Sequence, residues 1–233
     1  MDTKGTKITW LGHATFRFET SDGKVVIVDP WLGGNPACPD SEKEQSKADL
    51  VLITHGHFDH IADAVDVGKK LQPQTFAIPE TSAWLRSKDV PNVGELNKGG
   101  TVEVEGVKFT MTHAVHSCGI TDGDQVVYGG EAAGYVVEFP GGLKVYHAGD
   151  TTVFSDMKII ADLYEPDICL LPIGGWYTMS PREAAYACNL LSAKTVVPMH
   201  FGTFPILTGT PDELRKLVGS GVDVAEMKPG ETI

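Results

Sequence analysis

A dense cluster of metal-ligand side chains constrains this chain more than any other feature of its sequence. The cluster is the run Thr54-His-Gly-His-Phe-Asp-His60, which follows the apolar stretch 49–53. Imidazole nitrogens and carboxylate oxygens are the ligands that a borderline divalent ion such as Zn²⁺ accepts. We therefore interpret the run as half of a two-metal site rather than as polar residues of a surface loop.

The spacing within this run suits two ions. Alternate side chains of an extended segment point the same way, so His55 and His57 can reach one ion. Asp59 and His60 begin a helix predicted over residues 59–70, and from its first turn they can reach a second ion. A carboxylate at that position is favoured by the positive end of the helix dipole. The sequence therefore predicts two metals that lie close together.

Three downstream residues can complete the coordination of these ions. His116 stands just past the strand-like stretch 107–112, Asp150 ends the stretch 143–150, and His200 ends the stretch 194–200. Each residue follows an apolar strand near a turn, where α/β proteins usually place their binding and catalytic residues. A carboxylate has two oxygens, so Asp150 can bridge both ions. His113 competes with His116 for the same position.

The ordered set of these residues resembles the five signature motifs of the metallo-β-lactamase superfamily, and the likeness spans essentially the whole chain. The set consists of Val28-Asp29-Pro30, the run from His55 to His60, His116, Asp150 and His200. Other stretches resemble a branch of small bacterial and archaeal metal-dependent hydrolases related to L-ascorbate-6-phosphate lactonase and, more distantly, to N-acyl-phosphatidylethanolamine phospholipase D. These stretches are Trp10-Leu-Gly-His-Ala-Thr15, Val28-Asp-Pro-Trp31, Ile173-Gly-Gly175 and Met199-His-Phe-Gly202.

The resemblance implies a fold and a set of ligands. The fold is a four-layer αββα sandwich, an α/β architecture formed by residues 1–233 as one hydrolase domain. The ligand sets are His55, His57 and His116 for one ion, Asp59, His60 and His200 for the other, and Asp150 between them. Asp29 would lie buried behind the ligands. The stretch His116-Ser-Cys118 resembles the branch's third motif, which favours His116 over His113. Asp150 replaces the cysteine of the commonest zinc β-lactamases, which argues against antibiotic hydrolysis.

These ligands predict a dinuclear metal-dependent hydrolase. Two divalent ions lower the pKa of a shared water, so a bridging hydroxide can cleave a small ester, lactone or phosphodiester. We expect zinc, with manganese or iron as alternatives, and we assign catalytic roles to Asp59 and Asp150. Two other functions stay open: an iron-dependent redox protein of the same fold, and a metal-binding sensor module without catalysis.

The pattern of apolar residues independently predicts a layered α/β protein. Two helices have clear start signals, the capping boxes Ser180-Pro-Arg-Glu183 and Thr210-Pro-Asp-Glu213, each with proline at the first helical position. The predicted strands are residues 7–11, 15–19, 25–28, 50–53, 75–78, 101–104, 107–112, 134–138, 143–146, 168–172 and 195–197.

Composition limits the partners. The 31 acidic and 19 basic residues give a formal net charge of −12, which is unsuited to a nucleic-acid backbone. A small molecule is the expected substrate, and it can be anionic because the two ions supply positive charge. No apolar run approaches the ~20 residues of a membrane helix, so we expect no membrane insertion. The four cysteines show no Cys-x-x-Cys pairing and no secretion signal is evident, which favours the cytoplasm. A homo-oligomer stays possible.

The roles of three histidines and two loops stay open. His13 either orients substrate and supports the ligands or is a turn histidine bonded to backbone. His147 either supports the ligands or belongs to the core, and His113 fits an ordinary hydrogen-bonded role. The turn-rich segments 31–40 and 174–179 are predicted to wall the pocket. Their aromatic residues either line it or pack beneath the loops.

Overall fold

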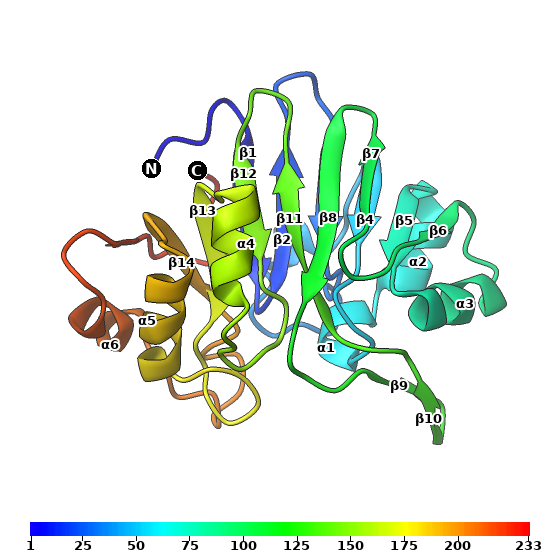
Figure 1. The fold of residues 1–233 in the computed structure, drawn as a ribbon. Helices are drawn as coiled ribbons and strands as arrows, with labels where there is room; N and C mark the ends of the chain where they lie inside the picture. Colours follow the sequence, from blue (N-terminus) through cyan, green and yellow to red (C-terminus); the bar gives the residue numbers. More distant parts are fainter.

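Two mixed β-sheets packed face to face form the centre of the molecule, and helices cover the outer face of each sheet (Figure 1). The computed structural model describes residues 1–233. The layers follow in the order helix, sheet, sheet, helix, so the predicted αββα sandwich is confirmed. None of the helices is both long and apolar enough to cross a membrane.

The first half of the chain forms a six-stranded sheet whose spatial order follows the sequence. Its first three strands pair antiparallel and its last three continue in parallel. Its strands are β1 (Lys7–Gly12), β2 (Thr15–Glu19), β3 (Val25–Val28), β4 (Leu50–Leu52), β5 (Gln74–Ala77) and β6 (Val93–Glu95). The helices of this half are a short 3-10 turn (Asp40–Glu42), α1 (Phe58–Ile61), α2 (Ala64–Leu71) and α3 (Pro79–Ser87).

The second half forms a seven-stranded sheet in the order β15-β14-β13-β12-β11-β8-β7. Its strands are β7 (Thr101–Val104), β8 (Val107–His113), β11 (Ala133–Glu138), β12 (Lys144–His147), β13 (Ile168–Pro172), β14 (Thr195–Met199) and β15 (Asp223–Val224). Its helices are α4 (Met157–Tyr164), α5 (Pro181–Leu190) and α6 (Pro211–Leu217). In both predicted capping boxes the glutamate accepts a hydrogen bond from the N-cap amide, 2.8 Å from Ser180 N and 3.1 Å from Thr210 N.

Strand β13 shows how the sequence builds the layers. Ile168 and Leu170 belong to the core between the two sheets, whereas Cys169 and Leu171 pack against the helices. Successive side chains of a strand point to opposite faces, so a strand covered on both sides must be apolar throughout. All five residues of β13 are buried.

The loops that carry the predicted ligands meet at one edge of the sandwich. Strands β8, β12 and β14 run in the same direction, because β8 and β12 both pair antiparallel with β11 and β12 to β14 are parallel. Their carboxyl ends therefore lie together, facing α1 after strand β4 of the other sheet. This edge is at the bottom of Figure 1.

The helix predicted over residues 59–70 is wrong in one respect, because two helices occupy this stretch. Helix α1 ends at Ile61 and α2 begins at Ala64. The helical hydrogen-bond pattern breaks at Asp63. Its amide donates to Pro30 O at 3.0 Å instead of to a carbonyl of the preceding helical turn. The Asp63 carboxylate in turn accepts from the amides of Leu32 and Gly33. These bonds tie the 31–40 loop to the end of the helix that carries Asp59 and His60.

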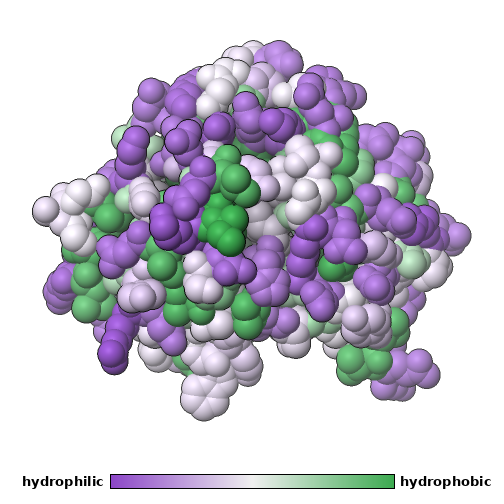
Figure 2. All heavy atoms as spheres, viewed as in Figure 1, coloured by the Kyte–Doolittle hydropathy of each residue, from purple (hydrophilic) through white to green (hydrophobic).

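Every predicted strand overlaps an observed one, but several elements were not predicted. They are the helices α3 and α4, the strands β6 and β15, and the hairpin of β9 (Gly119–Asp122) and β10 (Gln125–Tyr128). The hairpin belongs to neither large sheet and projects from the body (Figure 1). Polar and charged residues cover much of the face shown in Figure 2, with apolar residues exposed in separate small areas.

Candidate metal centre

The structure brings all seven predicted ligands together, and it adds an eighth side chain. Three groups of possible ligand atoms form, and within each group the atoms lie within 4.8 Å of one another. The third group, Asp29 with His55 and His60, shares its histidines with the other two, which we call cluster A and cluster B. Cluster A consists of His55, His57, His116 and Asp150, and cluster B of His13, Asp59, His60 and His200.

Cluster A joins the loop after β4 to loops of the second sheet. His57 Nδ1 lies 3.0 Å from His55 Nε2 and 3.2 Å from His116 Nε2. The Asp150 carboxylate approaches His55 Nε2 at 3.9 Å and His116 Nε2 at 3.6 Å. His113 lies outside the cluster, with its Nδ1 3.1 Å from Lys98 Nζ. The structure therefore places His116 in the cluster and His113 outside it, and the role of His116 as a ligand stays a prediction.

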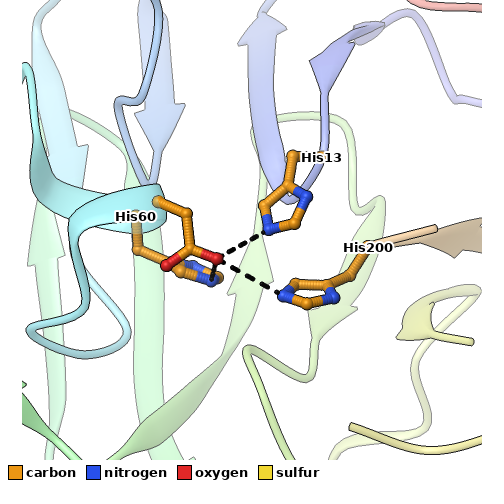
Figure 3. A group of neighbouring side chains, drawn as sticks. His13, His60 and His200 are labelled. Carbon is orange, nitrogen blue, oxygen red and sulfur yellow. Dashed lines mark hydrogen bonds and ion pairs between the residues drawn. The ribbon is translucent and has the colours of Figure 1, made fainter. Parts of the chain in front are cut away.

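Cluster B surrounds the carboxylate of Asp59 (Figure 3). Asp59 Oδ2 lies 2.9 Å from His13 Nε2, 3.7 Å from His200 Nε2 and 4.0 Å from His60 Nε2. Asp150 also reaches this cluster, because its Oδ2 is 3.0 Å from His200 Nε2 and its Oδ1 is 3.3 Å from His60 Nε2. Asp150 thus contacts histidines of both clusters, and its bridging of two ions stays a prediction.

Several buried atoms of this centre make no hydrogen bond of suitable geometry, although His60 Nε2 and His200 Nε2 lie close to the Asp150 carboxylate. They are His60 Nε2, Asp150 Oδ1 and both ring nitrogens of His200. Burying a polar atom without a partner costs free energy, so native proteins seldom leave such atoms together. Imidazole nitrogens and carboxylate oxygens are also the donor set of divalent transition metals. The residues present therefore fit a metal site.

Asp29 fixes the orientation of His60 from behind. The Asp29 carboxylate accepts hydrogen bonds from Thr54 N at 2.7 Å, Thr54 Oγ1 at 2.7 Å and His60 Nδ1 at 2.8 Å. With Nδ1 occupied, His60 Nε2 points at the clusters, an arrangement typical of metal-binding histidines. Asp29 is fully buried, as expected, and has a left-handed backbone with φ of 52°.

His13 combines the two roles that the sequence leaves open. Its ring lies between Asp59 and Thr203, with Nδ1 2.9 Å from Thr203 Oγ1. Its backbone carbonyl accepts hydrogen bonds from Trp10 Nε1 and from His200 N, each at 3.0 Å. One signal could have placed His13 in the site: like the predicted ligands, it stands at the carboxyl end of an apolar strand.

Two further side chains hold the loops of the centre in place. His147 Nε2 donates to Ala14 O at 2.9 Å, and His147 Nδ1 accepts from Gly149 N at 3.1 Å. His147 therefore ties the turn after β1 to the turn that carries Asp150. Cys118 Sγ accepts from Gly56 N at 3.3 Å and donates to Gly129 O at 3.1 Å, which joins the loop after β4 to the hairpin.

Burial and neighbouring charges divide the histidines into two electrostatic types. Burial lowers the pKa of His55 well below its usual value, and burial likewise lowers that of His13 to about 4. For His60 and His200 burial acts in the same direction, but the Asp150 carboxylate outweighs it. The pKa of His60 therefore rises well above its usual value, and that of His200 rises to about 9. Without metal, the Asp150 carboxylate therefore lies beside the protonated imidazoles of His60 and His200.

A cavity of about 620 Å³ opens onto both clusters. A volume in this range suits a small-molecule ligand. Of the aromatic residues expected to wall it, Tyr177 lines the cavity, Trp31 is buried, and Trp176 is exposed outside the lining. Its lining residues are His57, Asp59, His116, Asp150 and His200 from the clusters, with Phe58, Ser117, Thr121, Tyr177, Phe204 and Ile206 around them.

Comparison with known proteins finds relatives that match almost the whole chain. Residues 7–200 match the model of the β-lactamase superfamily domain. The chain is 62% identical over 232 residues to a UPF0173 metal-dependent hydrolase of Koribacter versatilis, covering 100% of this chain and 99% of that protein. A second such hydrolase, from Solibacter usitatus, is 53% identical and is covered to 99% of its length, against 97% of this chain.

A solved structure extends the likeness to three dimensions. A metallo hydrolase from the archaeon Ignicoccus hospitalis superimposes with a TM-score of 0.85 at 37% identity, covering 98% of this chain and 97% of that one. The finer resemblance to the lactonase and phospholipase branch stays a prediction, because neither enzyme is among these relatives. The fold, the clustered ligands and these relatives together show that the chain belongs to the metallo-β-lactamase superfamily and is one of its metal-dependent hydrolases.

Proposed function

We propose that the chain is a dinuclear hydrolase that acts on a small ester, lactone or phosphodiester. His55, His57 and His116 would hold one ion and Asp59, His60 and His200 the other, with Asp150 shared. Zinc is the metal that we propose first, because nitrogen and oxygen ligands suit it. The observation that carries the proposal is Asp150 itself, whose buried carboxylate lies within 4 Å of histidines from both clusters.

Two ions held by these residues would supply a water acidic enough to lose a proton near neutral pH and a Lewis acid for the carbonyl or phosphoryl oxygen. The chain's own contribution is to fix the ligands beforehand. Asp29 sets the ring orientation of His60, and His13 holds one oxygen of Asp59. His147 keeps the turn of Asp150 against the turn of His13. Such outer contacts raise metal affinity by keeping ligands oriented.

The two carboxylates differ in access to the cavity. The Asp59 side chain is 14% exposed, whereas that of Asp150 is 3% exposed. Both line the cavity, but Asp59 is the more exposed of the two. We therefore assign Asp59 to the exchange of a proton with substrate and Asp150 to holding the two clusters together. A general acid must come within hydrogen-bond reach of the leaving group, and only an accessible side chain can do so.

The organisation of the chain supports a single catalytic unit. The core between the sheets contains residues of both halves, from Ile8 to Met227. Each cluster also takes ligands from both sheets. We propose that residues 1–233 act as one hydrolase domain on a small molecule. The cytoplasmic location and the oligomeric state stay predictions.

Metal content and turnover test this function together. We would purify wild type, Asp150→Ala and the exposed-carboxylate control Asp162→Ala without added metal, and then assay ester, lactone and bis-aryl phosphodiester panels. The expected result is two ions per chain, with activity on one panel that Asp150→Ala loses and Asp162→Ala keeps. Iron as the sole metal with no turnover would contradict the hydrolytic proposal and favour the redox alternative.

A further inference from the structure

The cavity wall beside the two clusters is apolar and partly open to solvent. Phe58 is 55% exposed and Ile206 is 38% exposed, although both are large apolar side chains. Both line the cavity, together with Phe204 and Tyr177. Contiguous apolar surface in contact with water is uncommon on a soluble protein and usually marks a place where something binds. The wall therefore requires an explanation beyond packing.

This wall is built on a buried support. Trp31 is 3% exposed and its ring lies 5.8 Å from that of Phe58 and 5.8 Å from that of Phe204. Phe58 and Phe204 lie 6.5 Å apart, so the three rings form one contiguous aromatic group. Aromatic pairs at these separations stabilise each other. Phe58 and Phe204 come from segments far apart in the sequence and meet on Trp31, which gives the wall a fixed shape.

No lysine or arginine lines the cavity, and its only basic side chains are the histidines of the two clusters. Its lining outside the clusters is apolar except for the hydroxyls of Ser117, Thr121 and Tyr177, which can hydrogen-bond. A charged group of the substrate that lies away from the clusters would lose hydration without meeting a counter-ion. The net charge of −12 also repels anions at longer range. The cavity therefore disfavours a substrate with a remote phosphate or carboxylate.

We infer that the substrate carries an uncharged apolar group, at least as large as an aromatic ring, which contacts Phe58, Phe204 and Ile206. Its scissile bond lies beside Asp59 and Asp150, so this inference rests on the proposed hydrolytic function. Burying an aromatic group of this size against apolar residues favours binding, because it removes apolar surface from water. The volume of about 620 Å³ accommodates such a group together with the scissile bond.

Matched chromogenic esters test the inference by hydrolysis. We would compare p-nitrophenyl 5-phenylpentanoate with the p-nitrophenyl monoester of suberic acid, which have the same leaving group but end in a phenyl ring or a carboxylate. The phenyl ester should have at least tenfold higher kcat/KM. Phe204→Ala and Phe58→Ala should each raise its KM about tenfold with bound metal unchanged, whereas Tyr186→Ala, an exposed aromatic of α5, should not. Equal kcat/KM for the two esters would overturn the inference while leaving the hydrolytic function intact.

A binding measurement separates the inference from catalysis. The uncharged ketone 2-acetylnaphthalene has a carbonyl group that cannot be hydrolysed, and calorimetry can measure its affinity for the protein as purified. We expect binding that weakens about tenfold in Phe204→Ala and stays unchanged in Tyr186→Ala. Binding of this kind without turnover on the ester, lactone or phosphodiester panels would reject the hydrolytic function but retain the apolar subsite. Equal affinity in both variants would reject the subsite.

Discussion

His13 Nε2 lies 2.9 Å from Asp59 Oδ2, and this contact joins the turn after β1 to the first turn of α1. The His13 ring is fully buried and its other nitrogen is held by Thr203. The hydroxyl of Thr203 and the carboxylate of Asp59 therefore set the orientation of the imidazole from both sides. In this position His13 holds one oxygen of Asp59 in place.

We expect His13→Ala to weaken the binding of one ion and not of the other. Without the imidazole, the Asp59 carboxylate can rotate, and losing such an outer contact costs about 10–100-fold in metal affinity. Competition with a chromogenic chelator would measure the two dissociation constants. Thr203→Val leaves the His13 ring in place and removes only its hydrogen bond to the Thr203 hydroxyl, so its effect on metal affinity should be smaller. Two unchanged dissociation constants in His13→Ala would contradict this role.

Asp29 should matter for stability more than any exposed carboxylate. It accepts three hydrogen bonds inside the protein, so Asp29→Ala leaves buried donors without an acceptor. Breaking a buried charged network costs about 3–5 kcal/mol. Asp29→Asn should cost less, because asparagine tolerates a positive φ and keeps one acceptor oxygen. Urea unfolding of the metal-free protein, with Asp124→Ala as an exposed control, would check this order; equal losses in all three variants would refute it.

The elements that the sequence predicts well are those with a long apolar pattern. Strand β13 is buried on both faces and is apolar throughout, so its position and bounds are predicted correctly. The hairpin of β9 and β10 is missed because Val126 and Tyr128 are exposed and no sheet covers it. The break at Asp63 is missed because its cause is long-range: the amide and carboxylate bond to the loop that contains Pro30 and Leu32.

The residues of the site also fall into a predicted group and an unpredicted group. The seven predicted ligands are found because their residue types stand at strand ends in a spacing that metals require, although their binding of metal stays a prediction. The partners of His13 are not found, because they depend on which turns approach one another in space. Asp59 is 46 residues away along the chain and Thr203 is 190 residues away. No local pattern records such a contact.

Replacing Gly56 with any larger residue should destabilise the protein, because a side chain there would clash with its neighbours. A Cβ atom added there would lie 2.5 Å from Ile120 Cγ1, and Ile120 is fully buried. We expect Gly56→Ala to cost about 1–3 kcal/mol and to weaken metal binding at cluster A, because the loop with His55 and His57 must shift. Gly219→Ala is the matched control, since its Cβ would meet nothing within 4 Å.

A double-mutant cycle distinguishes the clash between a Cβ at position 56 and Ile120 from a general destabilisation of the fold. Ile120→Ala removes the side chain that the new Cβ would meet, so Gly56→Ala should be less harmful in that background. The free energy of unfolding of the four proteins gives the coupling. Strict additivity of the two substitutions would show that the contact with Ile120 is not the cause.

The metal-free protein should be most stable near pH 6.5. Asp150 holds the pKa of His200 at about 9 against the effect of burial, so the unfolded chain binds fewer protons than the native one above pH 6.5. This stability is present below pH 6.5 and is lost as the pH rises through about 9. Burial lowers the pKa of His13 to about 4, so the unfolded chain binds more protons between pH 6.5 and 4, and stability falls there too.

From pH 6.5 to 9, and again from pH 6.5 to 4, the free energy of unfolding should fall by on the order of 3 kcal/mol. The pKa values of His200 and His13 each differ by more than two units from 6.5, and one unit corresponds to about 1.4 kcal/mol. Denaturant titrations from pH 4 to 9 would measure it. A bound ion takes the place of the proton on His200, so zinc should flatten the alkaline side, and zinc affinity should fall as protons compete at low pH. Asp150→Asn removes the charge that raises the pKa of His200 and should likewise flatten the alkaline side. A metal-free wild type equally stable at pH 6.5 and 9 would show that His200 is not protonated beside Asp150.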